Sequence, residues 1–377
     1  MSFDLAASAP VPVGGSSSHA HGAAALPLDQ RERASGVGFL RAVLRDKAAL
    51  PPPYQRVIRE FLDRIDRLQR VESKNKTGFE HEYRSIHHSI ALAPGFEELF
   101  TPQTKHTNAK NRYRDVLPFE KTRVRLENPT NAPNGDYINA NYVDDTYIAC
   151  IAPVPPAICD FWHMVWQCDV HVILMLTNFV ERERIKADMY WESRGQIVDF
   201  GGVFVQLLGE EPHPASLGFI VRKFKMWTAA TTEARARVIQ HVQLTTWPDH
   251  GVLTDFRVIA PMLDLVNSYR EAAARAHGGP ARMIVHCSAG IGRSGTFIAI
   301  DVILKRLEAA LSLWRNASAA DGDAAIAHGA EMLREALDVA KLVHRLRTQR
   351  DGMVQTLEQY VMIHDYVAAL LDDRQPW

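Results

Sequence analysis

One short stretch of the sequence, from His286 to Gly295, combines a cysteine, an arginine and three glycines. An apolar, β-branched run precedes it and a helix-like run follows it. A strand that enters a tight turn and leaves as a helix points several backbone N–H groups, with the positive end of a helix dipole, at one point in space. Gly290, Gly292 and Gly295 permit that backbone path. The stretch therefore predicts a cradle for a phosphate dianion.

Cys287 stands at the start of this turn, where the same field would stabilise a thiolate. An ordinary thiol, with a pKa of about 8.5, is only a few per cent ionised at pH 7. Helix N-termini and nearby cations lower that pKa by about one to five units, which makes the nucleophilic thiolate dominant. Arg293 follows six residues later, and its planar guanidinium can hold two phosphate oxygens at once. Ser294 can donate a hydrogen bond to the sulfur when it leaves as a thiolate.

Two other interpretations of this stretch compete with phosphate chemistry. A single cysteine is most often a buried structural residue. The segment from Gly290 to Gly295 also matches the G-x-G-x-x-G pattern of dinucleotide-binding folds. However, no acidic residue stands at a strand end about twenty residues later, where a ribose partner is needed, because an Ala-rich helix occupies that place. The full stretch therefore favours phosphate chemistry.

A general acid and a water-binding pair are predicted elsewhere in the chain. A phenolate, with a pKa of about 10, leaves poorly unless it is protonated. Asp249 lies in the stretch Trp247-Pro-Asp-His-Gly251, and a loop framed by Pro and Gly suits a segment that closes over substrate. Gln355 and Gln359 are four residues apart in a helix-like segment, so they would share one face. Such a pair could hold the water that hydrolyses a covalent intermediate; a solvated helix face is the alternative.

The elements that must position these residues indicate an α/β fold. Three short apolar and β-branched stretches are typical of strands in a covered sheet, namely 147–152, 170–177 and 282–286. Helical repeats follow the three prolines at 51–53 and recur at about 295–313 and 357–371. We expect a highly twisted, mixed β-sheet flanked by α-helices.

The composition of the 377-residue chain, 46% hydrophobic and 23% charged, is that of an ordinary globular protein. Its 43 Lys and Arg balance 44 Asp and Glu, so charge predicts neither a nucleic-acid nor a membrane partner. The four cysteines lack paired metal-binding spacing, which favours a reducing, intracellular and cytoplasmic setting. No signal peptide and no run of about 18 apolar residues is found, so no membrane span is expected.

Two segments differ in composition from the rest. Residues 1–36 are rich in Ala, Ser, Gly and Pro, which predicts a flexible tail. Residues 315–339 are Ala-rich, with a loop-like stretch at 317–323, and we expect a surface insertion between two helices. The remainder of residues 37–373 would form one catalytic domain.

Several motifs occur in the order that makes the chain resemble the phosphotyrosine-specific protein tyrosine phosphatase family, from about Asn75 to Tyr366. The resemblance implies hydrolysis of phosphotyrosine in proteins through a covalent cysteinyl-phosphate intermediate. Cys287 would be the nucleophile and Arg293 would bind the phosphate. Asp249 would act first as the acid and then as the base. No metal or other cofactor is implied, and the oligomeric state is not predicted.

The same resemblance assigns the remaining site residues. The stretch from Asn111 to Val116 is similar to the family's recognition loop, in which Tyr113 would flank the phosphotyrosine ring and Asp115 would hydrogen-bond the substrate backbone. Glu181 would orient the arginine, and Lys186 would contact the closed acid loop. The other positions are Ser288, Ala289, Gly290, Ile291 and Gly292 around the phosphate, Ser294, Gln355 and Gln359 around the intermediate, and His286 and Trp247 as supports.

The chain departs from the family pattern at a few positions. Ile151-Ala152 stands where Gln-Gly is usual, His250 replaces a common Phe, and Leu253 replaces a common Pro. The tail and the insertion resemble those of kinetoplastid parasite members. Two rival functions remain: a catalytically inactive phosphotyrosine-binding module, which would lack Cys287 or Asp249, and a dual-specificity or lipid phosphatase, which would lack the recognition loop.

Overall fold

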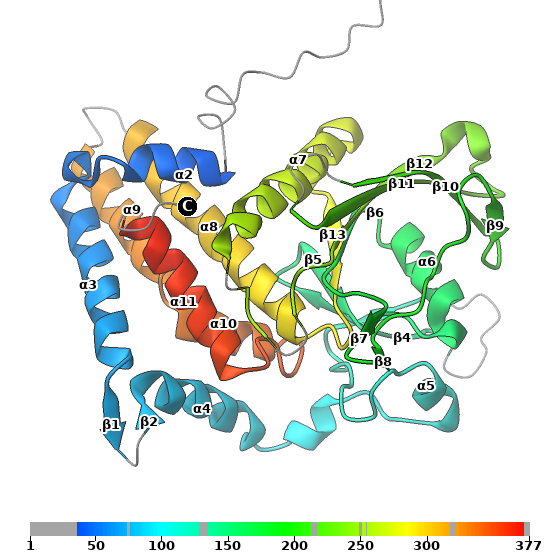
Figure 1. Cartoon of the computed structure of the whole chain (residues 1–377), viewed down its shortest axis with the longest axis horizontal. Helices are drawn as coiled ribbons and strands as arrows, with labels where there is room; N and C mark the ends of the chain where they lie inside the picture. Colours follow the sequence, from blue (N-terminus) through cyan, green and yellow to red (C-terminus); the bar gives the residue numbers. More distant parts are fainter. Residues whose placement is uncertain are drawn as a thin grey trace, which may run out of the picture.

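The computed structural model describes residues 36–73, 76–127, 135–212, 217–248, 251–253, 255–316 and 322–372. The predicted tail therefore lies, apart from Gly36, outside the described residues. Within them the chain forms a mixed sheet with helices on both of its faces, as Figure 1 shows. Among the described helices, none is both long enough and apolar enough to cross a bilayer.

The centre of the fold is a sheet of nine strands within the described residues. In spatial order these are β3 (Arg123–Arg125), β4 (Tyr137–Val143), β5 (Tyr147–Cys150), β13 (Arg282–His286), β6 (Val170–Met175), β12 (Arg237–Leu244), β11 (Phe219–Thr228), β10 (Val203–Pro212) and β9 (Ile197–Asp199). The four middle strands, from β5 to β12, are parallel, and the outer pairings are antiparallel. The expected mixed sheet is confirmed. Two short hairpins stand apart from it, β1 (Val71–Ser73) with β2 (Lys76–Thr77) and β7 (Val180–Glu181) with β8 (Arg184–Ile185).

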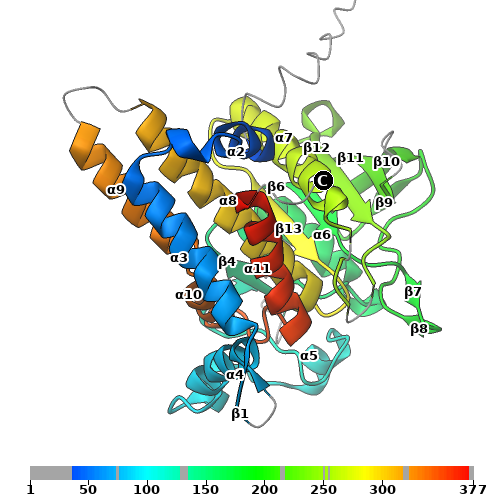
Figure 2. The ribbon, with the colours of Figure 1, turned by 60° about the vertical axis from the view of Figure 1, so that its left-hand side comes forward.

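The middle strands are apolar because both of their faces are covered. In β13, Met283 and Val285 belong to one apolar core, whereas Ile284 belongs to the other. Figures 1 and 2 show most helices gathered on the first face and α6 on the second. The helices are α2 (Gly36–Leu44), α3 (Pro52–Leu68), α4 (Gly78–Ala91), α5 (Lys105–Ala109), α6 (Ile158–Gln167), α7 (Ile259–His277), α8 (Gly292–Asn316), α9 (Gly322–Ala336), α10 (Val339–Arg347) and α11 (Leu357–Leu371).

The segment predicted as a surface insertion contributes a packed helix. Residues 317–321 lie outside the described part, but α9 begins at Gly322, one residue before the predicted end of the loop-like stretch at 323. In α9, Ala330 and Leu333 are buried against α8 and α3. The absence of a side chain at Gly329 makes room for Tyr54, whose hydroxyl donates to the Ala310 carbonyl at 3.0 Å. That this segment is an insertion relative to other chains stays a prediction.

Candidate active site

The turn after β13 places Cys287 between the end of a central strand and the start of α8. Its backbone reverses at Gly290, where φ is +69°, in the left-handed region that favours glycine. A Cβ at this position would lie 2.0 Å from the Cys150 carbonyl oxygen, so only glycine fits. The Gly290 N–H points back into the turn and donates to the Cys287 sulfur at 3.3 Å. The turn is therefore concave toward the thiol.

The Cys287 thiol is buried but acidic. Burial raises its pKa, but the lowering effects are larger and leave the pKa below its ordinary value. They come from the Arg293 guanidinium, the Ser294 hydroxyl and the N–H groups of Ser294 and Gly290. The Ser294 oxygen is buried and has no hydrogen-bond partner of ordinary geometry within the described residues. It therefore remains available to the sulfur. A thiolate is the nucleophilic form, so this position suits covalent chemistry.

Arg293 is held in place by segments far away in the sequence. Its two terminal nitrogens donate to the Glu181 carboxylate at 2.8 and 3.1 Å, from the β7–β8 hairpin. They also donate to the Trp247 carbonyl at 3.0 Å and to the Thr177 hydroxyl at 3.1 Å. The side chain is buried. A fixed, planar cation at the mouth of an N–H-lined turn is suited to bidentate binding of a phosphate.

A hollow of about 320 Å³ lies over Cys287 and brings most of the predicted binding residues together. Tyr113 stands on one wall, and its hydroxyl lies 2.8 Å from the Ser288 hydroxyl. Ser288 in turn donates to the Lys186 carbonyl at 2.6 Å, so these hydrogen bonds connect Tyr113 to the segment that contains Lys186. The lining residues are Tyr113, Asp115, Val116, Arg184, Ile185, Lys186, Cys287, Ser288, Ala289, Gly292, Arg293, Gln355 and Gln359.

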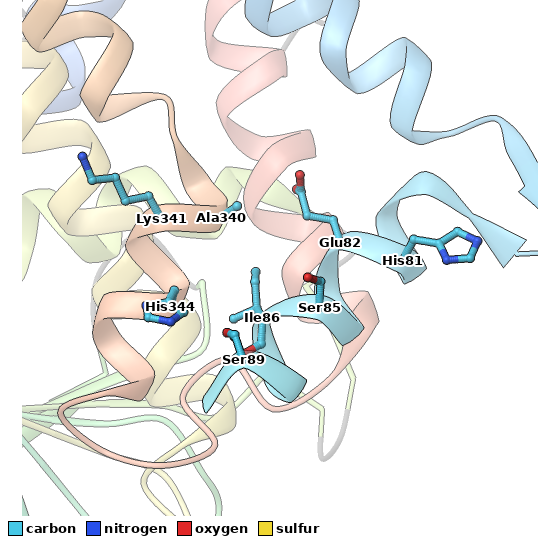
Figure 3. A pocket seen from close by; sticks show the side chains of 8 residues that line it. All are labelled: His81, Glu82, Ser85, Ile86, Ser89, Ala340, Lys341 and His344. Atoms are coloured by element: carbon cyan, nitrogen blue, oxygen red, sulfur yellow. The ribbon is translucent and has the colours of Figure 1, made fainter. Parts of the chain in front are cut away.

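A second and larger hollow, of about 550 Å³, lies between α4 and α10 (Figure 3). Its lining side chains are His81, Glu82, Ser85, Ile86, Ser89, Ala340, Lys341 and His344. It contains no cysteine, and Glu82 is already engaged by Arg64 and Tyr360. We therefore assign the chemistry to the smaller hollow, which holds the acidic thiol.

The two glutamines reach the site by a route that the sequence analysis predicted wrongly. Gln355 precedes the helix cap Thr356 and does not lie on a helix face, because α11 begins at Leu357. Gln359 is in the first turn, and its side chain reaches back to accept the Gln355 N–H at 3.0 Å. The same oxygen also accepts the Thr356 N–H at 3.3 Å, while the Thr356 hydroxyl accepts the Gln359 N–H at 3.2 Å. This reciprocal pair is a capping box, for which Thr356 and Gln359 provide the sequence signal. Both glutamines nevertheless line the hollow.

Asp249 and His250 lie outside the described residues. The residues on either side frame the acid loop: the Trp247 indole N–H donates to the Gly251 carbonyl at 3.2 Å. Through its own carbonyl, Trp247 also contacts Arg293. The start of the predicted acid loop is thus fixed to Arg293, whereas the position of the acid itself stays a prediction.

Side chains and a backbone N–H around the turn hold its carbonyls outward; of these residues, His286 was predicted as a support and Arg350 was not. Arg350 is fully buried and donates to the carbonyls of Ala289 and Gly290 at 3.1 and 3.0 Å. The Ala152 N–H donates to the Ser288 carbonyl at 3.0 Å, and His286 Nδ1 lies 3.1 Å from the Cys287 carbonyl. In a trans peptide the C=O and the next N–H point in opposite directions. Carbonyls held outward therefore aim the following N–H groups into the hollow.

No spacing or motif in the sequence marked Arg350 for this task. It stands five residues before Gln355, on a segment that is remote from the turn in the sequence. Burial lowers its pKa to about 10, so it remains a cation at neutral pH. The only available signal was an arginine near a glycine before the glutamine motif, and that signal is weak.

An acidic thiol, a fixed guanidinium and a ring of inward N–H groups define a class of site that transfers a phosphoryl group through cysteine. The family model described as protein-tyrosine phosphatase matches residues 107–369. The chain belongs to that family.

Curated relatives carry the same name. A tyrosine-protein phosphatase Lar-like from Caenorhabditis elegans is 37% identical over 308 residues, which cover 80% of this chain and 12% of that protein. Tyrosine-protein phosphatase 3 from Dictyostelium discoideum is 33% identical, over 82% of this chain and 30% of that protein. Tyrosine-protein phosphatase Lar from Drosophila melanogaster is 34% identical, over 82% and 13%. The chain thus spans less than a third of these relatives, and the likeness to kinetoplastid members stays a prediction.

Proposed function

We propose that this protein hydrolyses phosphotyrosine in proteins through a cysteinyl-phosphate intermediate on Cys287. The observation that carries the proposal is the lowered pKa of the Cys287 thiol beside a fixed Arg293. Membership of the family supports the same activity.

The first step is an in-line displacement. The Cys287 thiolate attacks phosphorus, a P–S bond forms, and the P–O bond to the tyrosyl oxygen breaks. Asp249 gives its proton to that oxygen, so tyrosine leaves as a neutral phenol. Arg293 and the inward N–H groups hold the equatorial oxygens while their charge is redistributed.

The second step returns the enzyme to its starting state. Asp249 takes a proton from a water that Gln355 and Gln359 hold, and the water attacks phosphorus. The P–S bond breaks, and the Ser294 hydroxyl stabilises the departing thiolate. Inorganic phosphate is released. None of these steps needs a metal ion, so activity should persist in a chelator.

Substrate choice follows from the shape of the hollow. Tyr113 on its wall would flank the aromatic ring, and a phosphoserine would be too short to bring its phosphorus to Cys287. Asp115 would bind the peptide backbone, and Lys186 would contact the acid loop when it closes. Phosphotyrosine proteins are the proposed partners, and nucleic acids are not.

The setting and extent of the enzyme are proposals as well. Residues 37–373 would form the catalytic domain and residues 1–36 a tail. We place the enzyme in the cytoplasm, because all four cysteines are free, as a reducing compartment requires.

Matched phosphotyrosine, phosphoserine and phosphothreonine peptides test the proposal, with phosphate release measured for wild type and Cys287→Ser. We expect release from phosphotyrosine alone and none from the variant. Equal release from all three peptides would indicate a dual-specificity enzyme. Retained phosphotyrosine binding without release from wild type would indicate a binding module.

Asp249→Ala separates the general acid from a substrate-holding loop. Turnover should fall by about 10²- to 10⁴-fold while peptide binding is retained. Loss of binding instead would mean that the loop holds substrate and supplies no proton.

A further inference from the structure

A row of buried polar side chains crosses the sheet behind the active site. Arg222 lies on β11, His241 and Gln243 on β12, and His286 ends β13. Tyr190, between β8 and β9, bridges the two histidines. All five are at most 4% exposed, and none of them lines the hollow over Cys287. Buried polar groups of this kind persist only when they are hydrogen-bonded.

The position of each side-chain proton in this row can be worked out by starting from the Cys287 carbonyl. The Cys287 carbonyl can only accept, so His286 must carry its proton on Nδ1, 3.1 Å away. Burial lowers the pKa of His286 to about 4, so its other nitrogen, Nε2, is unprotonated at neutral pH. Nε2 therefore accepts the Tyr190 hydroxyl proton over 2.9 Å.

The remaining hydrogen bonds follow in turn. A tyrosine hydroxyl has one proton, so the Tyr190 oxygen must accept from His241 Nε2 at 2.8 Å. Burial lowers the pKa of His241 well below its ordinary value, which leaves Nδ1 as an acceptor. Nδ1 faces Arg222 at 3.4 Å, and a guanidinium can only donate. The direction of every bond is thus consistent from Arg222 to Cys287.

The same guanidinium begins a second branch that ends at the phosphate-binding arginine. Arg222 donates to the Gln243 side-chain oxygen at 2.9 Å, and the Gln243 amide donates to the Thr177 carbonyl at 2.9 Å. The Thr177 hydroxyl accepts from Arg293 at 3.1 Å. Arg222 therefore contacts both chains of hydrogen bonds: one leads to the Cys287 carbonyl and the other to Arg293.

A purely structural role would not require this arrangement. Arg222 pairs with the half-exposed Glu210 and stacks at 4.5 Å on the Trp191 ring. The desolvation cost of the buried Arg222 charge offsets much of its attraction to the half-exposed Glu210, so this ion pair is a weak source of stability. A buried guanidinium can only donate hydrogen bonds, so it fixes the orientation of the groups that accept them.

We propose that Arg222 and His241 are positioning residues for the reaction: through Tyr190 they stabilise the Nδ1–H tautomer of His286 that the Cys287 carbonyl also requires. That tautomer holds the Cys287 carbonyl outward and aims the Ser288 N–H into the hollow. This inference rests on the proposed role of Cys287 as a thiolate nucleophile.

Histidine tautomers are the direct test, read by nitrogen NMR of reduced, ¹⁵N-histidine-labelled full-length protein at pH 7, with His286→Gln and His241→Gln spectra for assignment. We expect His286 as the Nδ1–H form and His241 as the Nε2–H form. A wild-type His286 that carries its proton on Nε2, or on both nitrogens, would overturn the inference.

A pair of substitutions tests the consequence for the thiol. His241→Phe removes the donor to Tyr190, whereas His241→Gln can place an amide N–H at the position of Nε2. The pH dependence of Cys287 alkylation by iodoacetate gives the thiolate pKa. We expect His241→Phe and Arg222→Met to raise it by about half to one unit, and His241→Gln to stay within about a third of that shift.

His171→Phe is the matched control. His171 is also buried, but it lies near the start of β6, whereas His286 pairs with Met175 at the end of that strand. The His171 ring stacks on His277 at 4.3 Å. This substitution should lower the folding stability without moving the thiolate pKa of Cys287.

The charged or titratable groups that face His241 and His286 are Arg222, Tyr190 and Arg112, together with Glu210 and Cys150 next to them.

The outcomes separate this inference from the proposed function. If His241→Phe and His241→Gln shifted the thiolate pKa equally, or if His171→Phe shifted it as much, the proposed roles of Arg222 and His241 would be overturned. Alkylation and tautomers need no turnover, so both can be read even if the peptide assay detects no hydrolysis. In that case the proposed function fails, while the spectra still decide which tautomers His241 and His286 adopt.

Discussion

Two buried cysteines end neighbouring strands and have opposite acidities. Cys150 ends β5, and Cys287 follows β13, the parallel strand beside it. They are 1% and 4% exposed. Burial raises the pKa of Cys150 to about 12, although the charge of Arg350 opposes this change. The pKa of Cys287 is instead lowered. Burial alone therefore does not decide whether a thiol is structural or reactive.

The difference lies in the donors around each sulfur. Cys287 faces the Gly290 N–H at 3.3 Å and the fixed Arg293 guanidinium. Cys150 packs instead within the apolar core of the opposite face. A strand that ends in a turn with inward N–H groups thus converts a buried thiol into a nucleophile.

The largest expected effect is a difference in alkylation rate between these cysteines. Iodoacetamide at pH 7 should modify Cys287 more than about a thousandfold faster than Cys150, because a thiol of pKa 12 is almost wholly protonated. The alkylation rate of Cys287 should level off at a lower pH than that of an ordinary thiol, since its pKa is lowered. Mass spectrometry of the native protein gives both rates.

Cys159 provides the control for access, because it is exposed but its pKa is raised by partial burial. If Cys159 reacted faster than Cys287, the comparison would be wrong. Peroxide should follow the same order and inactivate the enzyme through Cys287, since oxidation also requires the thiolate.

The next effect separates acidity from phosphate binding. Arg293→Lys keeps a positive charge near Cys287 but loses the planar fork, so kcat/KM for a phosphotyrosine peptide should fall by about 10²- to 10³-fold. Arg270→Lys, a change at another largely buried arginine that pairs with Asp301, should cost less than about threefold. Equal losses in the two variants would mean that general destabilisation explains both.

A smaller effect is expected from the residue that orients the turn. Arg350→Met frees the Ala289 and Gly290 carbonyls, so the N–H groups should converge less well and the thiolate pKa should rise. We expect kcat/KM to fall by about ten- to a hundredfold. Arg347→Met is the control, since buried Arg347 holds the carbonyls of Met353 and Val354 instead. A thiolate pKa unchanged by Arg350→Met would contradict this account.

The smallest effect should be that of Cys150 itself. Cys150→Ser replaces a protonated thiol with a hydroxyl outside the hollow, so we expect kcat/KM to change by less than about threefold. Steady-state kinetics and a melting curve check this expectation. A loss beyond tenfold with an unchanged melting temperature would give Cys150 a part in the chemistry.

Much of the local structure could be predicted from the sequence. The strand Arg282–His286 and the helix Leu357–Leu371 have the predicted bounds, because each is a continuous apolar or periodic run between clear breaks. The long strands β10 and β11 were not predicted. Their exposed ends carry charged residues, and the burial of alternate residues is irregular across the bulge near Leu207. Partly covered strands give a weak periodic signal.

The sequence by itself determined which groups can react. The six-residue spacing of Cys287 and Arg293 places both on one turn and its helix, which is a local property of the chain. Only the tertiary structure decided how Arg293 is held beside the thiol and where the carbonyls of the turn point. The groups that lower the pKa of Cys287 are Arg293, Ser294 and the Gly290 N–H, on its own turn and helix. Remote segments bring Glu181 to hold Arg293 and Arg350 to hold the carbonyls of the turn. Electrostatic energy depends on distance in space, and spacing along the chain does not report that distance.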